Sequence, residues 1–305
     1  MNKGSIGAVI VTYKTKDLLK KCLDSLSNDA GRTGLSLEVV VVDNASDDRT
    51  VEMVNKEFPA VTLIANPVNS GPARAFNQGI SEIIDRVDAT FILNSDIEVQ
   101  TGTLEVMINY LETNHDVDGV SGPLLNEDGS RQMTRTHIWS LGRPDYKQKF
   151  RVEFVGTTFA LIRTGVFRRI GGYDENYYFY NEDLDWAERA RRERCYFIYL
   201  PEAKVVHFLG RGRIQNQSQI IQKLYPSSIY YCKKFYRQWS WLTLWLLHID
   251  IIWRIFKLQV QLMFIRNTKA GTEITRSIAD YREARAQMNR EYRTERLPRI
   301  PLWKK

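Results

Sequence analysis

The feature that most constrains this chain is an alternation of short β-branched runs with segments of helical periodicity. Residues 6–12 read IGAVIVT and residues 37–42 read LEVVVV. Nearly continuous apolar runs of this length are typical of strands that are buried on both faces. Between them, residues 16–26 place leucines and Cys22 at helical spacing on one face. The pattern therefore predicts a strand, a helix and a second strand in succession.

The same alternation continues through the next hundred residues. It predicts helices at 49–58, 72–84 and 102–111, and strands at 61–66, 89–94 and within 153–163 and 195–207. Strands that alternate with helices form a parallel sheet with crossover helices, because each helix covers a sheet face between two parallel strands. With 43% hydrophobic residues the chain can bury a core, so disorder is not expected. The expected fold is α/β, with a Rossmann-like, mainly parallel sheet flanked by helices.

Polar side chains follow four of these strands. Ligands of open α/β sheets bind at the carboxyl ends of the strands. A single such group would be read as a turn or a helix cap, but four in succession favour a binding site. The groups are Thr12-Tyr13, Asp43-Asn44-Ala45-Ser46, Asn69-Ser70-Gly71 after Asn66, and Asn94-Ser95-Asp96.

Asp96 places a carboxylate directly beyond a buried strand. Hard cations such as Mg²⁺ and Mn²⁺ prefer oxygen ligands, and a diphosphate leaving group is stabilised by such a cation. The alternative is an ordinary turn aspartate. Three further carboxylates occur within residues 182–185, before a helical segment. Either they cap that helix, or one of them titrates in a reaction.

Six short motifs together resemble those of family 2 glycosyltransferases with the GT-A fold. They cover residues 6–210 in the family's order, and the branch they resemble contains bacterial rhamnosyltransferases. The motifs are VIVTYK, VVVDNASDD, NSGPARAFNQG, LNSDIEV, GGYDENYYFYNEDLDWAERARR and KVVH.

The resemblance implies a role for each motif. Nucleotide contacts would come from Thr12, Tyr13, Asp43, Asn44 and Ser46, and diphosphate or sugar contacts from Gly71, Arg74 and Asn77. Asn94, Ser95 and Asp96 stand at the family's metal motif, with Asn94 in place of its first carboxylate, and Asp96 would hold Mg²⁺ or Mn²⁺.

The later motifs imply the base and the rest of the metal site. Asp183 corresponds to the family's catalytic base, which takes the proton of an acceptor hydroxyl in an inverting displacement. His207 would complete the metal site, although a lone histidine is more often structural. Arg211 and Arg213 either close over the diphosphate or are solvated loop charges.

The C-terminal part differs in composition. From Lys204 onward there are 20 Lys and Arg residues against 6 acidic ones, whereas the preceding part has 23 against 30. The apolar run 239–252 is too short to span a bilayer, which needs about 20 residues. It fits a helix in the membrane interface, or alternatively a helix packed on the catalytic part or on another subunit of a homo-oligomer. We therefore expect a catalytic domain at 1–215, and a basic, amphipathic, membrane-associating helical region at 216–305 with an irregular proline-containing end.

These observations favour one function over several others. We expect an inverting transfer of rhamnose from dTDP-rhamnose to a lipid-linked saccharide in bacterial surface polysaccharide synthesis, with a UDP- or GDP-sugar donor as the alternative. The apolar side chains of the basic region and the absence of a nucleic-acid-binding motif argue against a nucleic-acid-binding protein. No GxGxxG follows the first strand, which argues against an oxidoreductase. Scattered Cys22, Cys195 and Cys232 and an N-terminus without a signal-peptide pattern suggest the cytoplasmic face of the plasma membrane.

Overall fold

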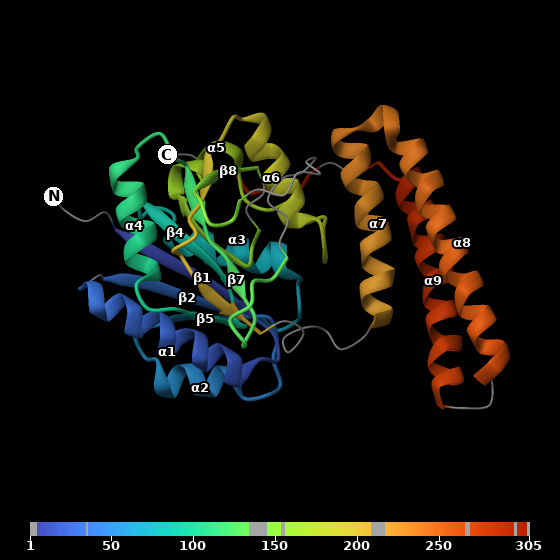
Figure 1. Cartoon of the computed structure of the whole chain (residues 1–305), viewed down its shortest axis with the longest axis horizontal. Coiled ribbons are helices and arrows are strands. Elements are labelled where there is room, and N and C mark those ends of the chain that lie inside the picture. Colours follow the sequence, from blue (N-terminus) through green and yellow to red (C-terminus); the bar gives the residue numbers. More distant parts are fainter. Residues whose placement is uncertain are drawn as a thin grey trace. The chain divides into compact units, whose positions relative to one another are not determined.

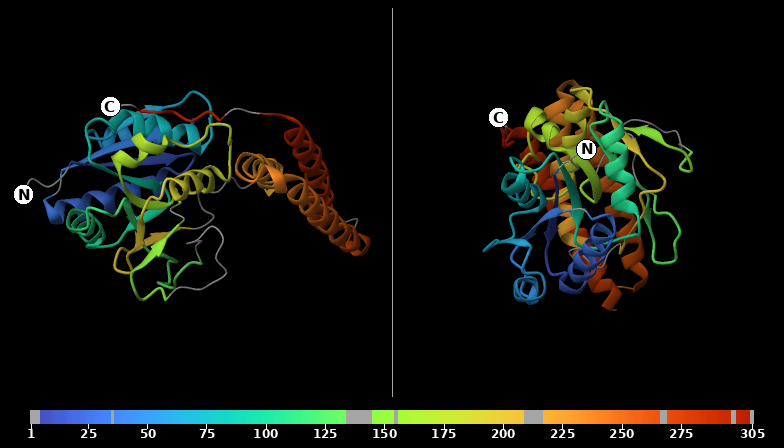
Figure 2. Two further views of the ribbon diagram at one scale, coloured as in Figure 1. Left: turned by 90° about the horizontal axis from the view of Figure 1, so that it is seen from above. Right: turned by 90° about the vertical axis from the view of Figure 1, so that its left-hand side faces the viewer.

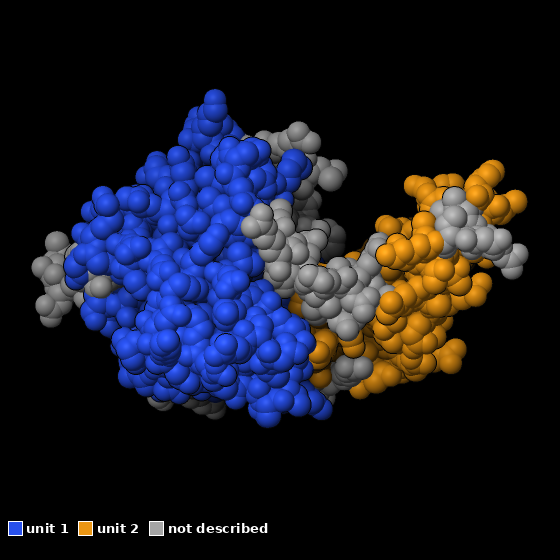
Figure 3. All heavy atoms as spheres, turned by 90° about the horizontal axis from the view of Figure 1, so that it is seen from below, with its two compact units in different colours: residues 1–175, 182–213, 299–305 blue, residues 176–181, 214–298 orange. Residues whose placement is uncertain are grey.

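A computed structural model describes residues 5–34, 36–133, 145–153, 156–208, 217–265, 269–295 and 298–303. The chain forms two compact units (Figure 3). Unit 1 comprises residues 1–175, 182–213 and 299–305, and unit 2 comprises residues 176–181 and 214–298. Residues 176–181 thus group with the C-terminal helices, and residues 299–305 group with the sheet of unit 1.

Unit 1 is built on an eight-stranded mixed sheet in the order β3-β2-β1-β4-β9-β6-β10-β8. Strands β1, β2 and β4 of this sheet are labelled in Figure 1. The first four strands are parallel, as the alternation predicted. The fifth, β9, runs antiparallel to both of its neighbours, and β8 runs antiparallel to β10. The strands are β1 (Ile6–Thr12), β2 (Leu37–Asp43), β3 (Thr62–Ala65), β4 (Ala89–Asn94), β6 (Gly119–Ser121), β8 (Phe150–Val152), β9 (Phe159–Arg163) and β10 (Phe197–Tyr199).

Helices cover both faces of this sheet (Figure 2). Because side chains alternate along a strand, β1 sends Ala8 and Ile10 to one face and Val9 to the other. One face packs on α1 (Lys16–Thr33), α2 (Thr50–Glu57) and α4 (Thr103–Thr113). The other packs on α3 (Pro72–Ile83), α5 (Thr164–Ile170) and α6 (Glu182–Arg192).

A second sheet of three short strands has the order β5-β11-β7. It consists of β5 (Ile97–Val99), β11 (Val205–His207) and β7 (Leu124–Leu125). Strand β11 pairs antiparallel with β5 and parallel with β7. This pairing brings the end of the KVVH motif back to the segment that follows β4.

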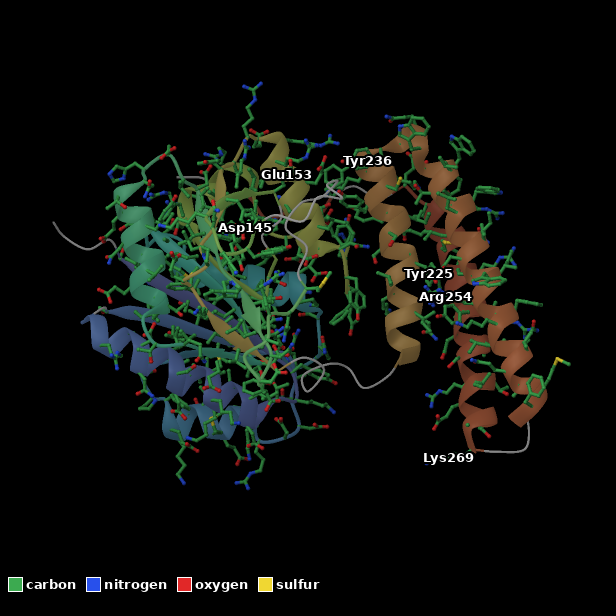
Figure 4. The ribbon with its side chains drawn as sticks, in the orientation of Figure 1. Asp145, Glu153, Tyr225, Tyr236, Arg254 and Lys269 are labelled. Carbon is green, nitrogen blue, oxygen red and sulfur yellow. The ribbon has the colours of Figure 1, made fainter. Side chains whose placement is uncertain are left out.

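Unit 2 contains the helices α7 (Gln217–Phe235), α8 (Ser240–Ile265) and α9 (Lys269–Arg293), with a short 3₁₀ turn, η1 (Arg237–Trp239). Ile229, Ile251 and Met288, one from each helix, are buried in its own apolar core. Tyr225 on α7 and Arg254 on α8 lie toward each other (Figure 4), and both hydrogen-bond Asp250, at 2.5 and 2.7 Å. None of the helices in the described ranges combines the length and apolarity that a membrane crossing requires.

Candidate active site

The carboxyl ends of three parallel strands meet at one edge of the large sheet. In the register of the sheet Thr12 pairs with Asp43, and Val11 pairs with Asn94. Beside them a chain of hydroxyl groups runs from Thr12 through Thr15 to Ser95, with both oxygen–oxygen distances 2.8 Å. Thr15, which sequence reasoning missed, therefore links the first strand end to the segment that carries Asp96.

Asp43 is buried, and only one of its two carboxylate oxygens accepts a hydrogen bond from a described residue. Its Oδ2 accepts a hydrogen bond from the Ser46 amide at 2.9 Å. Its Oδ1 has no hydrogen-bond partner among the described residues. A buried acceptor without a donor costs about 1–3 kcal/mol. That cost makes Asp43 suited to an N–H group of a ligand.

The residues around Asp43 fix the neighbouring loops. The Ser46 hydroxyl accepts the Lys14 amide at 2.8 Å, and Tyr13, which precedes Lys14, is half-buried. Asn44 donates to the Gly71 carbonyl at 3.1 Å and accepts from Ser70 at 3.2 Å. Asn44 thus holds the loop before α3 by its side-chain amide.

The three residues predicted along α3 are placed differently from one another. Gly71 precedes the helix with φ 81°, a conformation that favours glycine. Arg74 is exposed in the first turn. Asn77 is buried, and its amide exchanges hydrogen bonds with the backbone of Tyr173, donating to its carbonyl at 2.9 Å and accepting its N–H at 2.8 Å. A third bond joins it to Glu175 at 3.0 Å. Asn77 therefore fixes the segment between α5 and α6 that contains Tyr173 and Glu175, a role that the sequence did not suggest.

Asp96 and His207 are brought together by the pairing of β5 with β11. His207 Nε2 lies 3.4 Å from Asp96 Oδ1, and both residues are buried. On its other side, His207 Nδ1 lies 2.9 Å from Gln132 Oε1. The amide nitrogen of Gln132 donates to the His207 carbonyl at 2.7 Å, so its oxygen must face the ring.

The contact with Gln132 selects one tautomer of the neutral imidazole. Because Gln132 Oε1 can only accept, Nδ1 of that tautomer carries the hydrogen and Nε2 presents its lone pair toward Asp96. One carboxylate and one imidazole fit a divalent cation that takes its remaining ligands from water and a diphosphate. Gln132 was not predicted, because it lies 75 residues from His207 in the sequence.

The acidic segment at the start of α6 separates into three different environments. Asp185 is fully buried and forms an ion pair with Arg189 at 2.8 Å. Glu182 is buried, and this burial together with the charge of Asp183 raises its pKa to about 8. Asp183 is half-buried at the N-terminus of the helix. Of the three, Asp183 combines solvent access with a position that favours its anion.

The backbone directly before α6 is held in an unusual conformation. Tyr180 and Asn181 have φ values of 67° and 68°. Left-handed backbone at a residue other than glycine costs on the order of 1–3 kcal/mol when strained and is concentrated at functional sites. The helix that carries Asp183 therefore begins from a constrained turn.

The C-terminal strap, residues 299–303, supports the segment between α5 and α6. Gly172 N–H donates to the Pro301 carbonyl at 3.0 Å, and Asp174 accepts from the Arg299 amide at 2.9 Å. A Cβ atom at Gly172 would lie 2.6 Å from the ring of Trp303, so the close approach requires glycine. The expected irregular end of the chain is thus part of unit 1. Arg211 and Arg213 lie outside the described residues.

Known proteins match this chain in both sequence and structure. The family described as "Glycosyl transferase family 2" matches residues 8–171. The chain is 26% identical over 233 residues to "N-acetylglucosaminyl-diphospho-decaprenol L-rhamnosyltransferase" of Mycobacterium tuberculosis, covering 65% of this chain and 74% of that protein. It is 22% identical to "Rhamnosyltransferase WbbL" of Escherichia coli, covering 66% and 82%.

Solved structures show the same fold. TarS 1–349 of S. aureus superposes with a TM-score of 0.55 at 15% identity, covering 95% of this chain and 89% of that one. A mannosyltransferase of Pyrobaculum calidifontis, in complex with GDP-mannose and Mn²⁺, also gives 0.55 at 17% identity, covering 95% and 88%. The GT-A fold that the motifs implied is thereby confirmed.

Proposed function

This chain belongs to glycosyl transferase family 2, and we propose that it transfers rhamnose from dTDP-rhamnose, with inversion, to a lipid-linked saccharide in bacterial surface polysaccharide synthesis. It is a glycosyltransferase of the hexosyltransferase class, with rhamnosyltransferases among its relatives. The observation that carries a metal-assisted transfer from a nucleotide sugar is the Asp96–His207 pair at the carboxyl edge of the sheet, and the choice of rhamnose follows the named relatives.

We place the donor along this edge. The free Oδ1 of Asp43 would accept the N–H of a thymine or uracil ring, and Tyr13 would offer a face for stacking. Arg74, which is exposed, would reach the diphosphate as a charge-assisted donor. A Mg²⁺ or Mn²⁺ ion held by Asp96 and His207 would neutralise the charge that develops on the leaving diphosphate.

In the proposed reaction, Asp183 accepts the proton of an acceptor hydroxyl. The hydroxyl oxygen forms the new bond to the anomeric carbon from the face opposite the nucleotide. The bond between that carbon and the diphosphate oxygen breaks, and the electron pair leaves with the nucleoside diphosphate. Asp185 is unsuited to this task, because it is fully buried and its charge is used by Arg189.

We further propose that unit 2 holds the enzyme at the cytoplasmic face of the membrane that contains its acceptor. The inner side of α8, which includes Leu244, Leu247 and Ile251, packs in the core of unit 2. Its other side exposes large apolar side chains, among them Trp241, Trp245, Ile249, Ile252, Trp253, Phe256, Met263 and Phe264. Tryptophans at headgroup depth and the basic excess of this region suit an anionic lipid surface.

A donor screen with purified protein tests the function. We expect nucleotide release from dTDP-rhamnose in the presence of Mg²⁺ or Mn²⁺, and rhamnose transfer to a prenyl-diphosphate N-acetylglucosamine. Preferential use of a UDP- or GDP-sugar would replace the donor assignment and leave the enzyme class intact. Full activity in EDTA would exclude the metal role of Asp96 and His207.

A further inference from the structure

A pocket of about 410 Å³ lies within unit 2, between residues 176–179 and the helices α7 and α9. Its volume falls in the range of small-ligand sites, about 300–1,000 Å³. None of the donor-site residues at the sheet edge contributes to it. We propose that this pocket, hereafter the tyrosine pocket, binds the diphosphate-linked first sugar of the acceptor, an inference that rests on the proposed function.

The lining of the tyrosine pocket matches such a ligand. Tyr178, Phe179 and Tyr230 supply aromatic faces, on which the C–H face of a sugar ring can pack. Lys223 and Arg290 supply cations that pair with phosphate oxygens. A ligand that carries both a diphosphate and a sugar uses both kinds of group.

The charges of the pocket are arranged to receive an anion. Lys223 Nζ lies 4.7 Å from the centre of the Tyr178 ring, and within the described ranges no carboxylate lies within ion-pair distance of it. Arg290 contacts Glu283 at 3.0 Å, but both side chains are about half exposed or more, so solvent screens that pair. Glu291 also lines the pocket and is buried, so the described lining carries two cations against one carboxylate, a balance that favours an anion such as a diphosphate.

A hydrogen bond and a ring contact hold the Tyr230 side chain of the pocket in place. Asn176 donates to the Tyr230 hydroxyl at 3.0 Å, and the rings of Tyr177 and Tyr230 meet edge to face with their centroids 4.9 Å apart. Gln222 and Gln287 add amide groups that can donate to and accept from sugar hydroxyls. Such pre-positioned partners reduce the entropy lost on binding.

Chain connectivity ties this pocket to the base. Phe179 in the pocket wall is only four residues before Asp183, and four extended residues span at most about 14 Å. The intervening Tyr180 and Asn181 are fixed at positive φ. A short segment of defined backbone conformation therefore joins the pocket wall to the residue that would take the proton.

Calorimetric titration with a water-soluble, short-chain prenyl-diphosphate N-acetylglucosamine tests the proposal. Tyr178→Ala and Lys223→Ala should each weaken binding at least tenfold, whereas Arg276→Ala, an exposed residue of the same unit outside the pocket, should not. Lys223→Gln should behave like Lys223→Ala if the charge is what binds. In transfer assays the acceptor KM should rise about tenfold, with kcat changing less than threefold.

The outcomes separate this proposal from the function on which it rests. Binding of the prenyl diphosphate without its sugar, as tight as that of the complete probe, would reduce the site to a phosphate or lipid-headgroup site and overturn the sugar assignment. Equal binding by wild type and variants, or no binding by wild type that hydrolyses dTDP-rhamnose, overturns the pocket and leaves the function standing. Binding that depends on the pocket residues, by a protein that cleaves no nucleotide sugar, would support the pocket and overturn the proposed function.

Discussion

Replacing Trp303 by alanine should destabilise unit 1 measurably, although the residue is the third from the end of the chain. Its ring packs, half-buried, against the apolar cluster of α3, α5 and α6. Truncating a fully buried tryptophan costs about 3–5 kcal/mol, so a half-buried one should cost about 2 kcal/mol. For a domain of 150–250 residues, each kcal/mol lowers the melting temperature by about 2–4 °C. We therefore expect a loss of about 4–8 °C.

The matched control is Leu302→Ala, because Leu302 is 64% exposed and its truncation should cost less than about 1 kcal/mol. Both variants are compared by thermal denaturation, followed by near-UV circular dichroism. Equal melting temperatures for Trp303→Ala and wild type would refute the idea that the C-terminal strap is an integral part of unit 1.

The strap variant should also affect catalysis through α6. Gly172 N–H binds the strap, and the Gly172 carbonyl accepts a hydrogen bond from Arg189 on α6 at 2.6 Å. Loosening Gly172 should therefore disturb the position of Asp183 at the start of α6, and the transfer rate should fall more than the donor affinity. A fall in donor affinity alone would argue that the strap acts on the donor edge instead.

Three further predictions concern the metal, the base and the membrane surface. Asp96→Ala should abolish transfer in a folded protein, and EDTA should inhibit the wild type; activity that survives both would exclude a metal at Asp96. Asp183→Asn should lower transfer on the order of a hundredfold or more, with donor binding retained. Glu182→Gln should stay active near pH 7, because a pKa of about 8 keeps the native carboxyl largely protonated there. An inactive Glu182→Gln variant together with an active Asp183→Asn variant would make Glu182 the base. Trp245→Ser with Trp253→Ser should release the protein from anionic vesicles in co-sedimentation without stopping donor hydrolysis, and undiminished sedimentation would favour a protein contact for α8.

The sequence was most informative where a structural property repeats along the chain. The apolar runs predicted the parallel strands β1, β2 and β4, because a strand buried on both faces must be apolar throughout. The run at residues 61–66 also predicted β3, although β3 is a partly exposed edge strand. The helices α1 and α3 were predicted by their apolar stripes, although α1 continues beyond residue 26 to Thr33. The polar groups after the strands predicted the edge at which Thr12, Asp43 and Asn94 meet.

Other features have no such local signal. Gln132 orients His207 from 75 residues away, and Asn77 holds Tyr173 from 96 residues away. The antiparallel insertion of β9 between β4 and β6 likewise depends on pairing with strands distant in sequence. No periodicity or spacing marks these contacts, because each is made by a single pair of distant segments.

The sequence by itself therefore determined the fold class, the sheet edge at which Thr12, Asp43 and Asn94 meet, and the acidic segment at the start of α6. Only the tertiary structure decided which carboxylate of that segment is accessible, since Arg189 neutralises Asp185 in the interior while Asp183 remains half-exposed. It also decided that the last residues of the chain support Gly172. The physical reason is that burial and ion pairing are properties of a three-dimensional environment, which neighbouring carboxylates with the same local sequence do not share.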